Sequence, residues 1–179
     1  MARLPGFRND YNPAQGRGSL CGPAAMVCAG RYLGAPTALG IADRHALKAF
    51  LRDAGFGGGC GAQKLADLAP QLGLRARPIE GGLQAFLGQV SACTRSGRPV
   101  LVQWRPEALR ELGDRYGEKG HWGMVVEWPD GPVGGLELSD SLADDEGERS
   151  GPQPFPSVRA FLERGGVTSR APAVEVWLP

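Results

Sequence analysis

Hydrophobic positions in the first half of the chain recur at about every third or fourth residue, which is the spacing of one helix face. In residues 83–95, for example, this spacing turns Leu83, Phe86, Leu87 and Val90 to the same, inward side. Gly34 and Gly73 follow two such runs, at the position where glycine commonly ends a helix. The pattern predicts helices over residues 22–33, 37–54, 62–72 and 83–95.

The second half of the chain changes to short apolar or alternating runs, which are typical of β-strands. Pro129-Asp130-Gly131 is a turn sequence between two of these runs and predicts a hairpin. We expect residues 143–157 to form a surface excursion. The predicted strands are 74–79, 100–104, 122–128, 135–139 and 173–178, and a further short helix is predicted at 158–163.

Helices followed by mostly antiparallel strands indicate an α+β fold. No linker-like stretch interrupts the chain, so we expect a single domain over residues 1–179. Its helical lobe should cover about residues 12–95, and its sheet lobe about residues 96–179.

Composition narrows the classes of partner and cofactor. The chain has 20 Lys and Arg against 19 Asp and Glu, which gives no electrostatic reason to expect nucleic acid. No run approaches the roughly 18 apolar residues of a membrane helix, and the N-terminal residues do not resemble a secretory signal. Four cysteines without CxxC spacing and two histidines predict neither a disulfide scaffold nor a metal site. The glycine-rich segment 55–61 lacks the flanking residues of a phosphate loop, and we expect no cofactor.

Cys21 is the candidate nucleophile, because it stands where the first predicted helix begins, before Gly22-Pro23. Unpaired N–H groups and the positive end of the helix dipole stabilise a thiolate at such a position. An inert buried cysteine is the other interpretation. Cys28 lies two turns deeper on the same helix face, where core packing is expected.

His121 is the candidate base, because it follows Gly120 at the start of a predicted strand, where a ring can be aimed into a cleft. A structural histidine is the alternative. The other histidine, His45, lies among polar residues in a predicted helix and is expected at the surface.

Asp140 and Gln15 complete the candidate set. Asp140 ends the second strand of the predicted hairpin, so it should lie beside His121 and could orient the imidazole, although an ordinary turn aspartate would look the same. Asp130 is excluded because it lies at the opposite end of that hairpin. Gln15 precedes Cys21 by six residues, and its amide could donate to an oxyanion, although a lone loop glutamine carries no weight.

Taken together, these segments resemble the papain-like cysteine peptidases. The segments are Gln15, then Cys21-Gly22-Pro23-Ala24-Ala25, then Gly120-His121-Trp122, then Asp140. The chain looks closest to the bacterial branch that includes the bacteriocin double-glycine leader peptidases, and the similarity spans roughly residues 12–141. The sequence departs from this pattern in Ser139-Asp140-Ser141, where such peptidases often have Asp-Pro.

The resemblance implies a papain-like fold, with the cysteine on the helical lobe and the histidine and aspartate on the sheet lobe. It implies Cys21 as nucleophile, His121 as general acid and base, Asp140 as its orienting group, and Gln15 with the Cys21 N–H as the oxyanion hole. The expected function is a thiol protease or amidase that cleaves a peptide or protein amide.

Two alternatives remain open. The domain could be an effector or toxin that deamidates or transamidates a protein side chain, with an inhibitor or immunity protein as a further partner. It could instead be a non-catalytic binding module on the same fold. We expect a cytoplasmic protein, or one delivered into a target cell.

Overall fold

The computed structural model describes residues 1–8, 11, 20–57, 61–104, 121–131, 134–139, 153–163 and 173–179. The helices are α1 (Cys21–Leu33), α2 (Pro36–Gly40), α3 (Arg44–Asp53), α4 (Ala62–Leu68), the 3-10 helix η2 (Ala69–Leu72), α5 (Gly82–Arg95) and α7 (Val158–Glu163). The strands are β1 (Ala2–Arg3), β2 (Arg75–Pro78), β3 (Val100–Trp104), β4 (His121–Trp128), β5 (Leu136–Ser139), β6 (Gln153–Phe155) and β7 (Ala173–Trp177).

The described strands form one sheet in the order β2-β7-β3-β4-β5-β6, and β1 pairs with the C-terminal end of β4. Every pairing between them is antiparallel. β4 and β5 form the hairpin that the Pro-Asp-Gly turn predicts, and β7 lies between β2 and β3. The α+β class with an antiparallel sheet is therefore confirmed.

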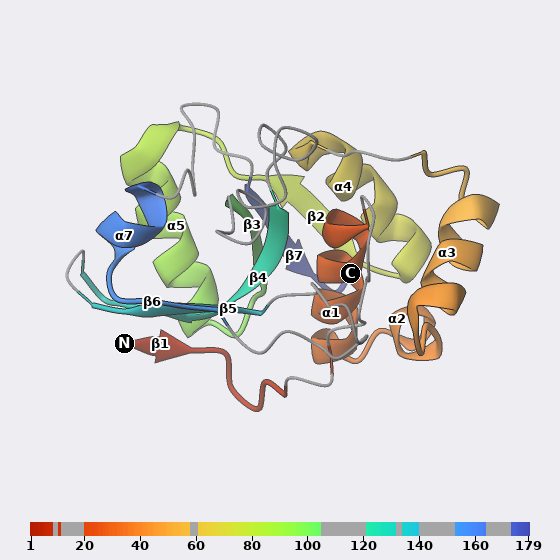
Figure 1. Cartoon of the computed structure of the whole chain (residues 1–179), viewed down its shortest axis with the longest axis horizontal. Helices are drawn as coiled ribbons and strands as arrows, with labels where there is room; N and C mark the ends of the chain where they lie inside the picture. The colour runs from red at the N-terminus through yellow and green to blue at the C-terminus, as the bar shows by residue number, and fades with distance from the viewer. Residues whose placement is uncertain are drawn as a thin grey trace, which may run out of the picture.

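Helices cover both faces of this sheet (Figure 1). Leu101 and Met124 pack with α1, α3 and α4 in one hydrophobic cluster. Val102 and Val125, their neighbours along the same strands, pack with α5 and α7 in a second cluster. Successive strand side chains point to opposite faces, so the two clusters lie on the two sides of the sheet.

Two predicted helices are divided in the structure. The 37–54 prediction becomes α2 and α3, because the Asp43 carboxylate accepts the N–H groups of His45 and Ala46 and caps a new helix. The 62–72 prediction ends as the 3-10 helix η2 at Pro70, which has no N–H for an α-helical bond.

Other differences are smaller. β6 lies within the predicted surface excursion 143–157, and β1 was not predicted. Leu83 was expected to face inward but is 44% exposed in the first turn of α5.

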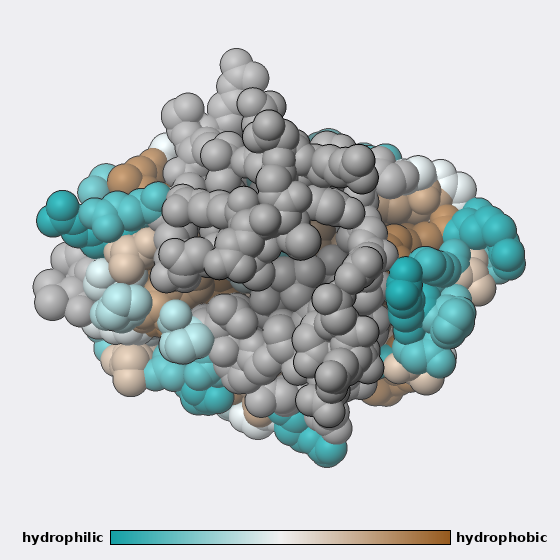
Figure 2. All heavy atoms as spheres, viewed as in Figure 1, coloured by the Kyte–Doolittle hydropathy of each residue, from teal (hydrophilic) through white to brown (hydrophobic). Residues whose placement is uncertain are grey.

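Figure 2 shows hydrophilic atoms over α3, whose exposed side includes Lys48 and Arg52.

Several elements from the first half of the chain pack with the sheet rather than apart from it. β1 and β2 are strands of the sheet, and α5 covers one of its faces. The division into a helical lobe and a sheet lobe near residue 95 stays a prediction. β1, β2 and α5 precede that residue in the chain but belong with the sheet. Among the helices of the described residues, none has the length and apolar character needed to span a membrane.

Candidate functional site

The helix α1 is buried on all sides, and this burial places its first residue. Residues 22–31 are all buried, and most of their side chains are small and apolar. A helix that is buried all round belongs in the middle of a fold rather than on its surface. Its first residue, Cys21, is only partly buried, so the thiol marks the point where the helix emerges from the core.

The start of β4 lies against the start of α1. Trp122 and Met124 belong to the same hydrophobic cluster as the α1 side chains, so β4 and α1 are packed directly together. The first residue of the strand is His121, and its side chain forms a hydrogen bond with the Cys21 thiol. The backbone N–H groups of Trp122 and Gly22 also donate to the sulfur. The structure therefore brings together the two residues that the sequence singled out for the nucleophile and the base.

These contacts decide the acidity of Cys21. Burial of the thiol raises its pKa, but the hydrogen bond and charge of His121 and the two backbone N–H groups outweigh burial. The net result is a Cys21 pKa below its ordinary value. Gly22 contributes an N–H because the first N–H groups of a helix have no partner within it.

His121 is itself enclosed, with only 2% of its surface exposed. The register of β3 on β4 pairs it directly with Trp104. The two rings meet edge to face, with their centroids 4.7 Å apart and their planes at 80°. This ring contact could not be predicted from the sequence, because it depends on the register of β3 on β4, and these strands are separated in the chain by residues 105–120.

The end of β5 lies beside both elements. Ser139, the last residue of β5, pairs with Met124 of β4, and its Oγ lies 3.8 Å from Cys28 Sγ on α1. β5 therefore ends opposite Met124, three residues along β4 from His121, and the expected place of Asp140 beside His121 stays a prediction. Asp140 follows directly, and it lies outside the described residues, as do Gln15 and Cys60.

The remaining candidates lie where they were expected. Cys28 is fully buried, and His45 is exposed at the start of α3. No group of three or more His, Cys, Asp or Glu side chains suited to a metal ion occurs within the part of the chain that the structure describes.

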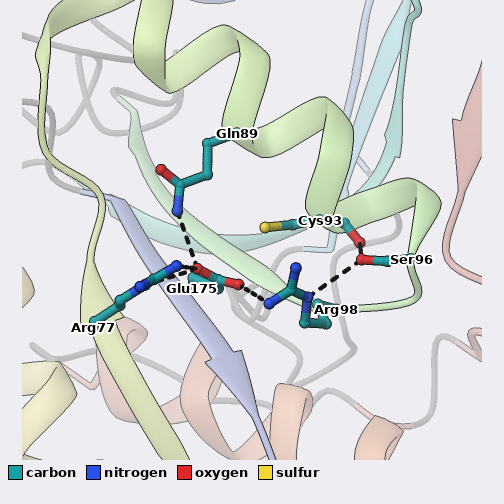
Figure 3. A network of polar contacts seen from close by, with 6 residues as sticks. All are labelled: Arg77, Gln89, Cys93, Ser96, Arg98 and Glu175. Atoms are coloured by element: carbon teal, nitrogen blue, oxygen red, sulfur yellow. Dashed lines mark hydrogen bonds and ion pairs between the residues drawn. The ribbon is translucent and has the colours of Figure 1, made fainter.

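A second polar cluster was missed by the sequence. The Glu175 side chain on β7 is 1% exposed and accepts hydrogen bonds from Arg77 and from Gln89 (Figure 3). Its other oxygen lies 2.6 Å from Arg98 Nη1. The available signal was a single charged residue in an apolar strand, Ala-Val-Glu-Val-Trp, because a buried carboxylate needs charged or hydrogen-bonding partners.

Comparison with known proteins identifies no family for this chain, so a functional proposal must rest on the site alone. No protein-family model matches the chain, and a search of curated proteins found no match.

Proposed function

We propose that the protein is a cysteine peptidase or amidase with a papain-like fold, acting on a peptide or protein amide. One observation carries the proposal: the thiol at the start of a central helix is hydrogen-bonded to the histidine that begins an adjacent strand, and the pKa of the thiol is lowered. A nucleophile and base within hydrogen-bond reach, with an acidified thiol, is the arrangement that thiol-dependent acyl transfer requires.

The proposed reaction begins when the Cys21 thiolate attacks the carbonyl carbon of the substrate amide. A C–S bond forms, and the carbonyl oxygen becomes an oxyanion that accepts hydrogen bonds. Protonated His121 gives its proton to the leaving amine as the C–N bond breaks. Neutral His121 then takes a proton from water, which attacks the thioester and releases the acid and the Cys21 thiolate.

Two further roles come from the resemblance. Gln15, together with the Cys21 backbone N–H, is proposed to donate to the oxyanion, where losing one donor typically costs roughly 10²–10³ in kcat. Asp140 is proposed to hold the tautomer of His121. The position of Ser139 beside Met124 supports this role, because Asp140 is the next residue in the chain.

The first test is alkylation by iodoacetamide across roughly pH 4 to 9, read by peptide mass spectrometry. In the wild type, Cys21 should react well below the ~8.5 at which an ordinary thiol becomes reactive. His121→Ala should abolish that low-pH reaction while circular dichroism shows an intact fold. Cys93 is an internal control, because burial and Glu175 raise its pKa to about 12.

Ordinary or absent reactivity of Cys21 would contradict the proposal. If Cys21 reacts only at the pH of an ordinary thiol, or not at all, the catalytic proposal fails and a binding module becomes the better account. Once a substrate is found, mass spectrometry of the target separates backbone cleavage from conversion of a side-chain amide into an acid. Only the first result agrees with a peptidase.

A further inference from the structure

The indole of Trp104 and the imidazole of His121 are in contact, and both side chains are buried in the protein. They are directly opposite each other on β3 and β4, so their side chains share one face of the sheet. Trp104 is 1% exposed and His121 is 2% exposed, and the ring centroids lie 4.7 Å apart. Little space therefore remains on that side for the imidazole to turn.

Gly123 explains why the indole can occupy this place. A Cβ atom at Gly123 would lie 2.5 Å from Cζ3 and 2.7 Å from Cη2 of Trp104. It would also lie 2.5 Å from the carbonyl oxygen of Ser139. Because real Cβ atoms do not approach this closely, the missing side chain makes the slot that holds the outer ring of Trp104 against β4.

The contact has a direct consequence for Cys21. The imidazole of His121 can hydrogen-bond to the Cys21 thiol only when a ring nitrogen points at the sulfur. Rotation of the His121 side chain would break that hydrogen bond. A large rigid ring in edge-to-face contact opposes rotation, because any turn of the imidazole either collides with it or loses the contact.

We propose that Trp104 is a positioning residue, whose indole holds His121 in the orientation that bonds to Cys21, with Gly123 providing the space for that indole. The catalytic consequence rests on the proposed function, whereas the contact itself is a feature of the structure. In an acyl-transfer enzyme a misplacement on the order of 1 Å costs roughly 10²-fold in rate.

The test compares Trp104→Leu and Trp104→Phe with a matched control, Trp128→Phe. Trp128 is a buried tryptophan at the other end of β4, and its rings contact Phe86 and Phe161 instead of His121. Trp104→Leu should lose most of the low-pH alkylation of Cys21, and Trp104→Phe should restore part of it because a flat ring returns. Trp128→Phe should alkylate as the wild type does, although it also removes part of a buried ring.

The conservative variant keeps the test decisive if Trp104→Leu does not fold. Trp104→Phe should then move the pH profile of Cys21 alkylation to higher pH than in the wild type, whereas Trp128→Phe should leave that profile unchanged. Circular dichroism checks that each variant is folded.

The two proposals fail separately. Cys21 without low-pH reactivity in the wild type overturns the proposed function. Wild-type reactivity that is retained in folded Trp104→Leu and Trp104→Phe overturns the positioning role and leaves the proposed function standing. If only Trp104→Phe folds, a pH profile of Cys21 alkylation equal to that of the wild type also overturns the positioning role.

Discussion

Burial raises the pKa of two thiols in this chain, but their neighbours then act in opposite directions. At Cys21, His121 and two backbone N–H groups outweigh burial, and the pKa falls below its ordinary value. At Cys93, the adjacent Glu175 carboxylate adds to burial, and the pKa rises to about 12 although Arg98 and Arg77 oppose the rise. The two environments therefore predict one reactive and one inert cysteine.

At the scale of the residue, we predict that Asp140→Ala weakens the low-pH alkylation of Cys21. A carboxylate beside the imidazole would stabilise its charged form, and that charge lowers the pKa of the thiol. Each unit by which the Cys21 pKa rises removes roughly tenfold of the thiolate at low pH. Rate constants for iodoacetamide near pH 5 measure the effect.

The matched control for Asp140 is Asp130→Ala. Asp130 lies in the turn at the opposite end of the hairpin, where its carboxylate accepts from Arg95 Nη1 at 3.1 Å. This variant should alkylate as the wild type does. Equal rates for the Asp140 variant and the wild type would remove Asp140 from the proposed triad.

At the scale of the element, the small residues of α1 let neighbouring elements pack close to the helix on all sides. Gly30 is the point of closest approach, because a Cβ there would lie 2.5 Å from Ala38 Cβ on α2 and 3.2 Å from Leu74 Cδ1. The sequence predicted a helix over 22–33 from its apolar residues. It could not predict this close approach, because Gly30 resembles any glycine in a helix until α2 is placed beside it.

We predict that Gly30→Ala destabilises the protein by about 1–3 kcal/mol, because the added methyl group must push α1 and α2 apart. Urea unfolding followed by circular dichroism measures the change. Gly88→Ala is the matched control, since Gly88 is exposed in α5 with nothing within 4 Å of its added Cβ. There the same substitution should stabilise the protein by roughly 0.5–1 kcal/mol, because alanine favours a helix. A Gly30 variant as stable as the wild type would contradict the close packing.

Most elements were predictable because periodicity is a local property. The predicted ranges for β3 and α7 agree with the structure, and most of the others agree within one or two residues at their ends. The divided helices are exceptions with local causes, namely the capping carboxylate of Asp43 and the missing N–H of Pro70.

At the scale of the whole molecule, the strand nearest the end of the sequence lies inside the sheet. β7 joins β2 to β3, and its Glu175 connects to Arg77 on β2, Gln89 on α5 and Arg98 before β3. Burial raises the pKa of Glu175, but Arg77, Arg98, Cys93 and Gln89 together hold it below its ordinary value. A charged carboxylate thus links segments that are distant in the sequence.

The lowered pKa gives the stability a definite pH dependence. A carboxyl group whose pKa is lower in the folded state stabilises the protein above its unfolded pKa of ~4.3. That contribution disappears as the pH falls through the folded value. We predict that Glu175→Gln lowers the free energy of unfolding by about 1–3 kcal/mol at neutral pH, because Arg77 and Arg98 lose their carboxylate partner. Both arginines are partly exposed and remain hydrated, so the cost stays below that of a fully buried unpaired charge.

Urea unfolding of both proteins between roughly pH 3 and 7 measures this effect. The difference between wild type and Glu175→Gln should shrink as the pH falls below the unfolded value. Glu163→Gln is the control, because its pair with Arg159 is exposed on α7 and should contribute less than about 0.5 kcal/mol. A difference for Glu175→Gln that is the same at every pH would show that the carboxylate charge is not its source.

The sequence by itself determined the local features of this protein. Helical and strand periodicity, the turn of the hairpin and the N-terminal position of Cys21 all depend on near neighbours in the chain. The same reasoning identified His121, and the structure brings it into contact with Cys21.

Only the tertiary structure decided which distant residues meet. The pairing of Trp104 with His121, the place of β7 and the burial of Glu175 all depend on strand register and strand order. A shift of one residue in register would turn Trp104 to the other face of the sheet. Such pairings join segments separated by long stretches of chain, and their energy comes from packing and desolvation that no local pattern contains.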